Sequence, residues 1–158
     1  MALYMKYGSL DGACTTKGFE KWIELNSFQW GVGRAIGTGA RGSLSREHSE
    51  PTISEITVTK LTDKSSPKLF EEALYGKLDT KVEIKFTTTV KNSVETFLSY
   101  ELTNTGPSHY SLGSGGDMPT ETLTLNFTKI QMKFTPMEAG LSGSPEQVGY
   151  DLEKMQKL

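Results

Sequence analysis

The sequence has few of the residues that catalytic and metal sites require. Among 158 residues it has one cysteine, Cys14, and two histidines, His48 and His109. A lone cysteine excludes a disulfide within the chain and a cluster of thiolate ligands. The two histidines lie far apart in glycine- and serine-rich stretches, outside any ligand spacing or nucleophile motif. We therefore expect no metal, no cofactor and no enzymatic activity.

Charge of one sign and long apolar runs are also missing. The 17 basic and 19 acidic residues are well mixed and leave a net charge of −2, which provides no basic face for nucleic acid. No stretch approaches the roughly 20 apolar residues of a membrane-spanning helix. The first residues, "MALYMKYGSLDG", lack the basic and apolar regions of a signal peptide. We expect synthesis in the cytosol, no membrane insertion, and export only by a route without a signal peptide.

What the sequence does have is alternation of apolar and polar residues, which predicts strands. The clearest case is "KVEIKFTTTV", in which Val82, Ile84 and Phe86 alternate with charged residues. Similar alternation predicts at least six strands, which lie within residues 2–8, 21–33, 52–61, 81–90, 95–104 and 120–134. The length and pattern indicate one domain, residues 1–158, with a mainly β fold of the small barrel or sandwich type.

One segment alone has the pattern of a helix, "SSPKLFEEALYGK". Ser66 can cap its start, Pro67 suits the first helical position, and Gly76 supplies a left-handed stop. The segment has one apolar stripe, formed by Leu69, Phe70, Ala73 and Leu74. We predict a short helix, from about Pro67 to Tyr75, that plugs or covers the β-structure.

The stretch "TETLTLNFTKIQMKF", residues 120–134, changes its apolar parity halfway. The first set is Leu123, Leu125 and Phe127, and the second set is Ile130, Met132 and Phe134. A strand points alternate side chains to opposite faces, so we predict the two sets on opposite sides of the sheet, with a β-bulge at residues 128–129. Without a bulge, the first half of one straight strand would pack on the barrel core and its second half on a neighbouring subunit.

Residues 31–51, "GVGRAIGTGARGSLSREHSEP", form a long glycine-rich segment without periodicity. Loops of this length are usually functional or disordered. The glycine spacing is GxGxxxG and no amphipathic helix follows it, so a flexible loop is favoured over a nucleotide site. Residues 104–119 form a second glycine- and serine-rich connection.

Five segments, in this order along the chain, resemble the haemolysin-coregulated protein (Hcp) family of bacterial type VI secretion. They are "LYMKYGSLDGACTTKG", "IELNSFQWGVG", "ITVTKLTDKSSPKLFEEALYGK", "TETLTLNFTKIQMKF" and "VGYDLEKMQ". The third is the most specific, because it is similar to the family's strand, its D-K-[ST]-[ST]-P turn and its single helix. The five segments span nearly the whole chain.

The resemblance implies a small antiparallel β-barrel of two sheets with one helix. It also implies that six copies close into a ring and that rings stack into a tube. A contractile sheath expels this tube, a spike protein tips it, and effectors can travel in its lumen. The protein would wait in the bacterial cytoplasm and be secreted without a signal peptide.

The principal hypothesis is therefore a structural protein that forms stacked hexameric rings. From its place in the family pattern, the long loop is expected to contact the next ring through Arg34, Gly37, Arg41, Leu44 and Arg46. Residues 21–33 carry apolar side chains on both faces, which suits a strand that packs on its own core and on a neighbour. The candidates for this contact are Trp22, Ile23, Leu25, Ile130, Met132 and Phe134.

Two other classes of function stay open. A monomeric ligand-binding β-barrel would need an apolar interior pocket with a few convergent polar groups. A small hydrolase would need a catalytic base, and His48 and His109 are its only candidates.

Overall fold

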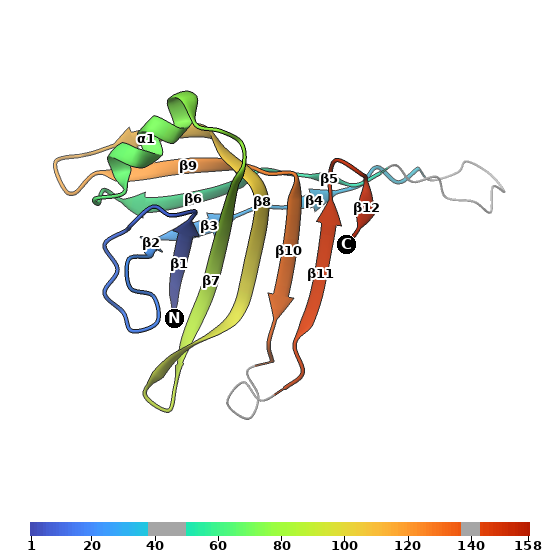
Figure 1. Cartoon of the computed structure of the whole chain (residues 1–158), viewed down its shortest axis with the longest axis horizontal. Coiled ribbons are helices and arrows are strands. Elements are labelled where there is room, and N and C mark those ends of the chain that lie inside the picture. Colours follow the sequence, from blue (N-terminus) through green and yellow to red (C-terminus); the bar gives the residue numbers. More distant parts are fainter. Residues whose placement is uncertain (38–49, 137–142) are drawn as a thin grey trace.

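Figure 1 shows a computed structural model of the chain, which describes residues 1–37, 50–136 and 143–158. The described residues form a mainly β fold with one α-helix, as predicted. In chain order the elements are β1 (Ala2–Tyr7), β2 (Ile23–Leu25), β3 (Ser27–Gln29), β4 (Val32–Gly33), β5 (Thr52–Ile53), β6 (Ile56–Leu61), α1 (Ser66–Tyr75), β7 (Thr80–Val90), β8 (Ser93–Gly113), β9 (Thr120–Asn126), β10 (Lys129–Phe134), β11 (Glu146–Asp151) and β12 (Gln156–Lys157).

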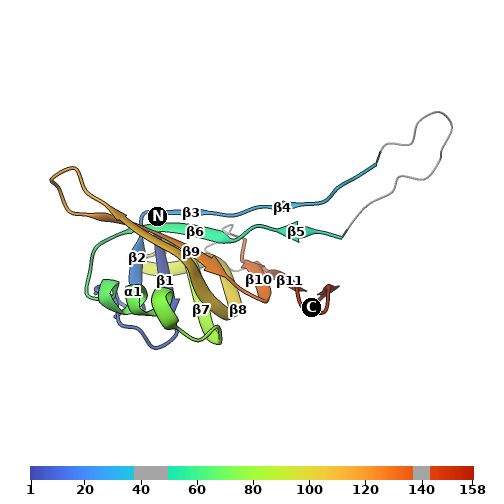
Figure 2. The same cartoon turned by 90° about the horizontal axis from the view of Figure 1, so that it is seen from above.

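The strands form two layers that face each other across a core (Figure 2). One layer has the order β12-β11-β10-β8-β7-β1-β2, and the other consists of β3, β6, β9 and the second half of β8. All pairs are antiparallel, and the 21-residue strand β8 belongs to both layers. The expected connection at residues 104–119 is therefore wrong for residues 104–113, which are strand because they pair with β9. The two-sheet prediction is confirmed, but the ladder does not close into a barrel because β2 and β3 are not paired with each other.

The expected single strand over residues 120–134 is two strands with a corner between them. β9 pairs with β6 and the second half of β8, whereas β10 pairs with the first half of β8 and with β11. Phe127 and Thr128 connect the two, so the chain passes from one layer to the other. The predicted placement on opposite sides of one sheet is therefore wrong. The side chains that face the shared core are Leu123, Leu125, Phe127 and Ile130.

The irregular residue expected at 128–129 lies instead in the partner strand β8. Asn104 has a φ of 52°, and the register of β8 against β7 shifts between the pairs of Thr80 and Val82. The Asn104 side-chain amide donates a hydrogen bond to the Thr128 hydroxyl at 3.1 Å. The bend in β8 and the corner between β9 and β10 therefore support each other.

A second corner joins β2 to β3 and follows the same rule. Ile23 and Leu25 face the core from one layer, and Phe28 faces it from the other, beside Val58 of β6. Between them, the Asn26 backbone N–H donates to the Thr59 carbonyl at 2.7 Å. The two apolar parities of residues 21–33 therefore reflect a change of layer rather than a strand that is apolar on both faces.

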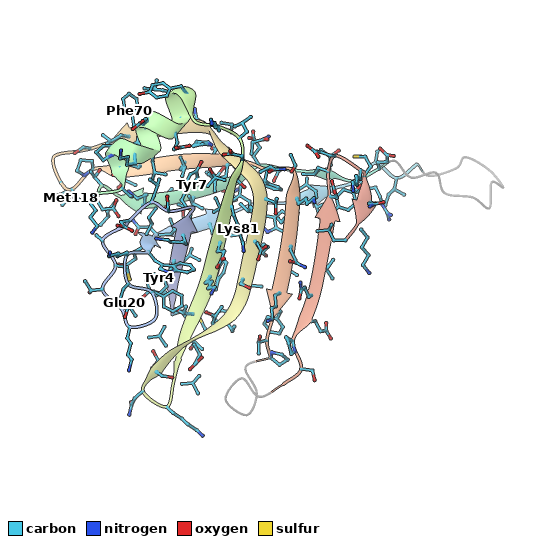
Figure 3. All side chains as sticks on the ribbon, viewed as in Figure 1. Tyr4, Tyr7, Glu20, Phe70, Lys81 and Met118 are labelled. Atoms are coloured by element: carbon cyan, nitrogen blue, oxygen red, sulfur yellow. The ribbon has the colours of Figure 1, made fainter. Side chains whose placement is uncertain are left out.

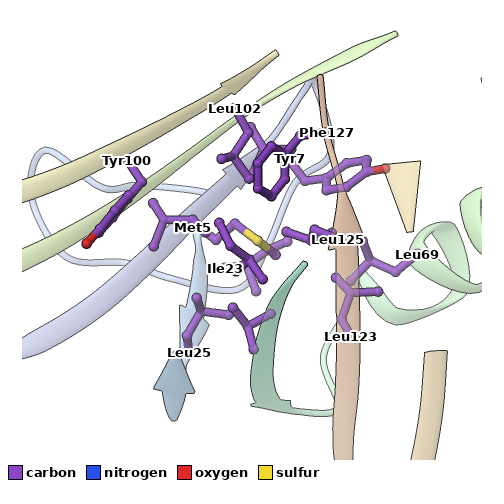
Figure 4. Close-up of a cluster of buried hydrophobic side chains, with 14 of the residues drawn as sticks. Met5, Tyr7, Ile23, Leu25, Leu69, Tyr100, Leu102, Leu123, Leu125 and Phe127 are labelled. Atoms are coloured by element: carbon purple, nitrogen blue, oxygen red, sulfur yellow. The ribbon is translucent and has the colours of Figure 1, made fainter. Parts of the chain in front are cut away.

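Side chains from both layers and from α1 fill one continuous core (Figure 4). Its fully buried members include Met5, Tyr7, Ile23, Ile56, Leu69, Leu102, Leu123 and Leu125. Each such aliphatic side chain contributes about 1.5–3 kcal/mol by its removal from water. This filled core leaves the exterior surfaces as the places to look for function.

The helix α1 starts and ends differently from the sequence prediction. Its N-cap is Ser65 rather than Ser66, so Pro67 occupies the second helical position. Gly76 has a φ of −65° and an extended backbone, so the predicted left-handed stop is wrong. Of the apolar stripe, Leu69 is fully buried, whereas two members point to solvent, Phe70 and Leu74.

Candidate functional site

Among the described residues, no group of three or more His, Cys, Asp or Glu side chains could hold a metal ion. His109 lies exposed on β8, and His48 is outside the described residues. No helix in residues 1–37, 50–136 and 143–158 is long and apolar enough to cross a membrane.

An apolar groove lies between β10 and β11 on one side and residues 30–32 and 51–53 on the other. Its volume is about 350 Å³. We call it the β10–β11 groove, and its lining consists of Trp30, Val32, Pro51, Ile53, Ile130, Met132, Val148, Gly149 and Tyr150. The floor is built by cross-strand pairing of Ile130 with Tyr150 and of Met132 with Val148. Because Val148 is 56% exposed, part of this apolar floor is open to water.

The groove offers little to orient a polar ligand. The Trp30 indole N–H already donates to the Tyr100 hydroxyl at 3.3 Å, and the two rings meet edge to face at 5.6 Å between centroids. The remaining lining side chains are almost all aliphatic. Such a surface favours an apolar occupant held by shape and by its removal from water.

A two-stranded arm leaves the body beside this groove. β4 and β5 pair through Val32 with Ile53 and Gly33 with Thr52, and they extend away from the two layers (Figure 2). Two hydrogen bonds join the strands at the base of the arm. The Gly31 N–H donates to the Ser54 hydroxyl, and the Ser54 N–H donates to the Gly31 carbonyl.

Two of the five expected ring-stacking residues can be placed relative to this arm. Arg34 and Gly37 are exposed beyond β4. Arg41, Leu44 and Arg46 are outside the described residues, so their stacking role stays a prediction.

The expected subunit-contact residues divide into three groups. Ile23 and Leu25 are in the core of their own chain. Trp22 packs edge to face on Phe19, with the Lys85 ammonium 5.1 Å from the centre of its ring.

The remaining three expected contact residues lie together on β10. Ile130 is buried and Met132 is half-buried, and both line the β10–β11 groove. Phe134 is 40% exposed near the end of the strand. The structure therefore brings these three to one surface and leaves Trp22, Ile23 and Leu25 elsewhere.

Several strand edges are open within the described part of the chain. β12 and the following Leu158 cover β11 only at residues 149–151, where the Leu158 N–H donates to the Gly149 carbonyl at 3.0 Å. The edge of β11 from Glu146 to Val148 has no strand partner there. On the far side of the body, β2 pairs only with β1 and β3 only with β6. Open edges are places where another chain can add a strand.

The outer face of α1 is a further apolar surface, which the sequence prediction placed against the sheet. We call it the α1 patch, and its exposed members are Phe70, Leu74, Tyr75 and Leu78. Phe70, labelled on α1 in Figure 3, is 53% exposed. Its ring meets Tyr110 at 6.1 Å between centroids.

A buried ion pair under the start of α1 holds the helix in this orientation. Lys60 of β6 and Glu121 of β9 are both fully buried, directly paired across the ladder, with 2.6 Å between Nζ and Oε2. The Ser66 hydroxyl donates to the same carboxylate at 2.7 Å, and the Tyr110 hydroxyl donates to its other oxygen. Lys60 also donates to the Leu61 carbonyl at 2.9 Å.

The turn before the helix completes this network. The Asp63 carboxylate lies 3.1 Å from the Lys60 ammonium and accepts hydrogen bonds from the backbone N–H and hydroxyl of Ser65. Burial acts to raise the pKa of Asp63, but these hydrogen bonds and the Lys60 charge outweigh it and hold the pKa below its usual value. Burial, together with the Glu121 carboxylate, raises the pKa of Tyr110.

The sequence itself indicates this ion pair, because one charged residue on each of two strands stands at a position that faces the core. Lys60 has the parity of Ile56 and Val58, and Glu121 has the parity of the two leucines that follow it. A charged residue in phase with a core face is either unpaired, which is costly, or matched by an opposite charge. One such charge on each of two strands indicates a buried pair.

The outer face of β7 and β8 is charged and solvated. Lys81 lies 3.4 Å from Glu83 and 3.5 Å from Glu101, and Lys85 pairs with Glu83 at 3.8 Å. The Lys81 side chain, labelled on β7 in Figure 3, is 58% exposed. The charges of Glu101 and Glu83 raise the pKa of Lys81. Both signs alternate over this face, so it attracts neither polyanions nor polycations strongly.

Comparison with known proteins places these surfaces in context. A family model described as "Type VI secretion system effector, Hcp" matches residues 4–134. Protein hcp1 of Pseudomonas aeruginosa is 23% identical over 156 residues, which cover 96% of this chain and 95% of that protein. One solved structure of a type six secretion system protein superposes with a TM-score of 0.88 at 26% identity, over 99% of both chains. Hcp1 from Salmonella typhimurium has a TM-score of 0.76 at 18% identity, over 99% of this chain and 98% of that one.

Proposed function

Since the chain belongs to the Hcp family of type VI secretion proteins, we propose that it is the subunit of the secreted inner tube. Hcp proteins are secreted structural proteins rather than enzymes. In this proposal six copies close into a ring, rings stack into a tube, and effectors travel in the lumen. The observation that carries it is the pair of unmatched surfaces on one protomer, the β10–β11 groove on one side and the open edges of β2 and β3 on the other.

Ring closure needs two different surfaces on each copy, because a head-to-tail contact is heterologous. The protomer supplies them: the β11 edge and the groove at one end, and the β2 and β3 edges at the other. Of the expected contact residues, Met132 and Phe134 retain exposed surface for this purpose. Trp22 can contribute from the outer face of the sheet.

Stacking uses the β4–β5 arm in this proposal. The arm places Arg34 and Gly37 outside the body and leads to Arg41, Leu44 and Arg46. Arginines that contact the next ring would make tube growth sensitive to salt, because the Debye length shortens as ionic strength rises.

By family membership, the proposed partners are the spike protein at the tip, the contractile sheath around the tube and secreted effectors. The proposed location is the bacterial cytoplasm before firing and the outside of the cell afterwards. Secretion inside the sheath would need no signal peptide.

The alternative is a monomeric ligand-binding β-barrel, and one observation favours it. The groove volume of about 350 Å³ falls within the range of small-molecule sites. Against it, the groove has few polar groups to select a ligand.

Light scattering on the purified protein separates the two functions. The tube proposal expects a mass of six chains and six-fold rings in negative-stain images, whereas a mass near 17.4 kDa would overturn it. Stacking is tested separately by replacing residues 37–45 with a short linker. We expect this variant to form rings that do not extend into tubes, and normal tube growth would contradict the stacking role.

A further inference from the structure

The side chains of the α1 patch are each more than half exposed in the described part of the chain. Phe70 and Leu74 are 53% and 60% exposed, and their i, i+4 spacing places them on one face of the helix. Tyr75 and Leu78 are exposed at the end of the helix and just after it. Exposed apolar side chains that share one helix face, as Phe70 and Leu74 do, mark interaction sites more often than single exposed residues do.

The orientation of the patch is built into the fold. Leu69 and Ser66 are the only residues of α1 that are buried. Ser66 joins the network of the Lys60–Glu121 ion pair, which fixes the start of the helix on β6 and β9. Charged partners in a dry site tolerate little displacement, so the helix cannot rotate its apolar face inward without breaking them.

We propose that the α1 patch of one copy docks into the β10–β11 groove of the next copy around the ring. This inference rests on the proposed hexameric ring and adds which two surfaces meet. Phe70 and Leu74 enter the groove from above its floor of Ile130, Met132 and Val148. This is the helix-in-groove mode of recognition, in which anchors at i and i+4 fill an apolar channel.

The positions of the two surfaces support a second copy as the occupant. α1 lies at one end of the protomer, and β10, β11 and the arm lie at the other (Figure 1). A head-to-tail ring requires a convex and a concave surface that face opposite ways, so that each copy donates one and accepts with the other. One contact of this kind covers both apolar surfaces in every copy.

Other occupants leave part of the apolar surface exposed. A two-fold contact of groove against groove would cover the groove and leave the α1 patch in water. A small ligand in the groove would have the same consequence, and the apolar lining gives it little orientation. Docking of a neighbouring α1 is the arrangement that accounts for both surfaces.

The first test is the mass of surface variants by light scattering. We expect Phe70→Asp and Leu74→Asp to lower the mass from six chains to one, because each places a charge in an apolar contact. The matched control is Met118→Asp, which alters an exposed methionine at the same end of the protomer but off the helix (Figure 3). It should keep the mass of the unaltered protein. Urea unfolding should show that all three variants are folded.

The second test is a disulfide between copies, in a Cys14→Ser background. A chain with both Leu74→Cys and Val148→Cys should give, on oxidation, a ladder of covalent species up to six chains. Chains with either cysteine alone should give no ladder.

The outcomes distinguish this inference from the ring itself. If the unaltered protein is hexameric and both helix variants remain so, the docking is wrong and the ring stands. A covalent species that stops at two chains would point to a two-fold contact and overturn the docking. If the unaltered protein has the mass of one chain, the ring proposal fails and the docking fails with it.

Discussion

The two ends of the protomer are organised by different physics. At the α1 end, a fully buried Lys60–Glu121 pair is surrounded by hydroxyls and a second carboxylate. At the groove end, aliphatic and aromatic side chains such as Met132 and Val148 meet around open space. The first end has a polar, hydrogen-bonded interior beneath the apolar α1 patch, and the second is apolar and partly open to water.

This contrast suits a protein that presents one surface and receives another. Buried charges require specific partners at short distance, so they fix one arrangement of the helix that they anchor. Apolar contacts are non-directional, so a groove can adjust to what enters it. A fixed helix and an adaptable groove would let copies join in a closed ring despite small errors in angle.

Breaking the buried pair should cause the largest loss of stability. Glu121→Ala leaves the Lys60 ammonium buried without its main partner, and loss of one partner of a buried pair costs about 3–5 kcal/mol. The free energy of unfolding, measured by urea titration, should fall by that amount. The double variant Lys60→Met/Glu121→Leu should recover part of the loss, because it removes the unpaired buried charge, while the Ser66 and Tyr110 hydroxyls still lose their acceptor. A loss below about 1 kcal/mol for Glu121→Ala would contradict the described network.

The groove end should respond differently from the core when a methyl-bearing side chain is cut. Leu125→Ala opens a cavity in the filled core and should cost about 2–5 kcal/mol. Val148→Ala removes a side chain that is 56% exposed in the protomer, so the same urea titration should show less than about 1 kcal/mol. Equal losses would mean that the groove is already closed in the isolated protomer.

The sequence is sufficient for the elements that local pattern determines. Alternation locates β1, β6, β7, β9, β10 and the first half of β8, and the Ser-Ser-Pro start locates α1 to within one residue. Alternation does not locate β11, β12 or the second half of β8, which lies in the glycine- and serine-rich residues expected to form a connection. The parity switch after Phe127 is plain in the sequence but ambiguous, because a corner between layers and a bulge within one sheet produce the same pattern. Only the pairing of β9 with β6 and of β10 with β11 separates the two cases, and pairing is a long-range property.

The exposed apolar surfaces are harder to predict for a related reason. The stripe of α1 indicates a helix that covers the sheet, yet Phe70 and Leu74 face outward because the buried pair beneath sets the rotation of the helix. Similarly, Ile23 and Leu25 are core residues. The chain changes layer at Asn26, so the apolar side chains before and after this corner face the same core. Which apolar side chains stay exposed after folding depends on the packing of the whole fold.

Acid should weaken the α1 end by a smaller amount. The pKa of Asp63 is lowered in the folded state, so its contribution to stability is present above the usual pKa of an aspartate and is lost as pH falls through the folded value. In Asp63→Asn, this part of the decrease in the free energy of unfolding at low pH should be absent. Urea titrations between pH 7 and pH 3 would measure the decrease. The change should be up to about 1 kcal/mol, because Asp63 borders a surface depression and is partly screened by water. An unchanged slope in Asp63→Asn would assign the acid response to other groups.

The smallest effect should come from an ion pair on the outside of the same helix. Lys68 and Glu71 are 3.7 Å apart and exposed, in contrast to the buried pair below them. Solvent and salt screen such pairs, so Lys68→Ala should change the free energy of unfolding by less than about 0.5 kcal/mol, and added salt, about 0.5 M NaCl, should remove the difference. Comparison of this variant with Glu121→Ala separates the contribution of an exposed ion pair to the free energy of unfolding from that of a buried ion pair. A loss as large as that of Glu121→Ala would mean that α1 is held by its surface charges, and the contrast between the two ends would no longer rest on the buried pair.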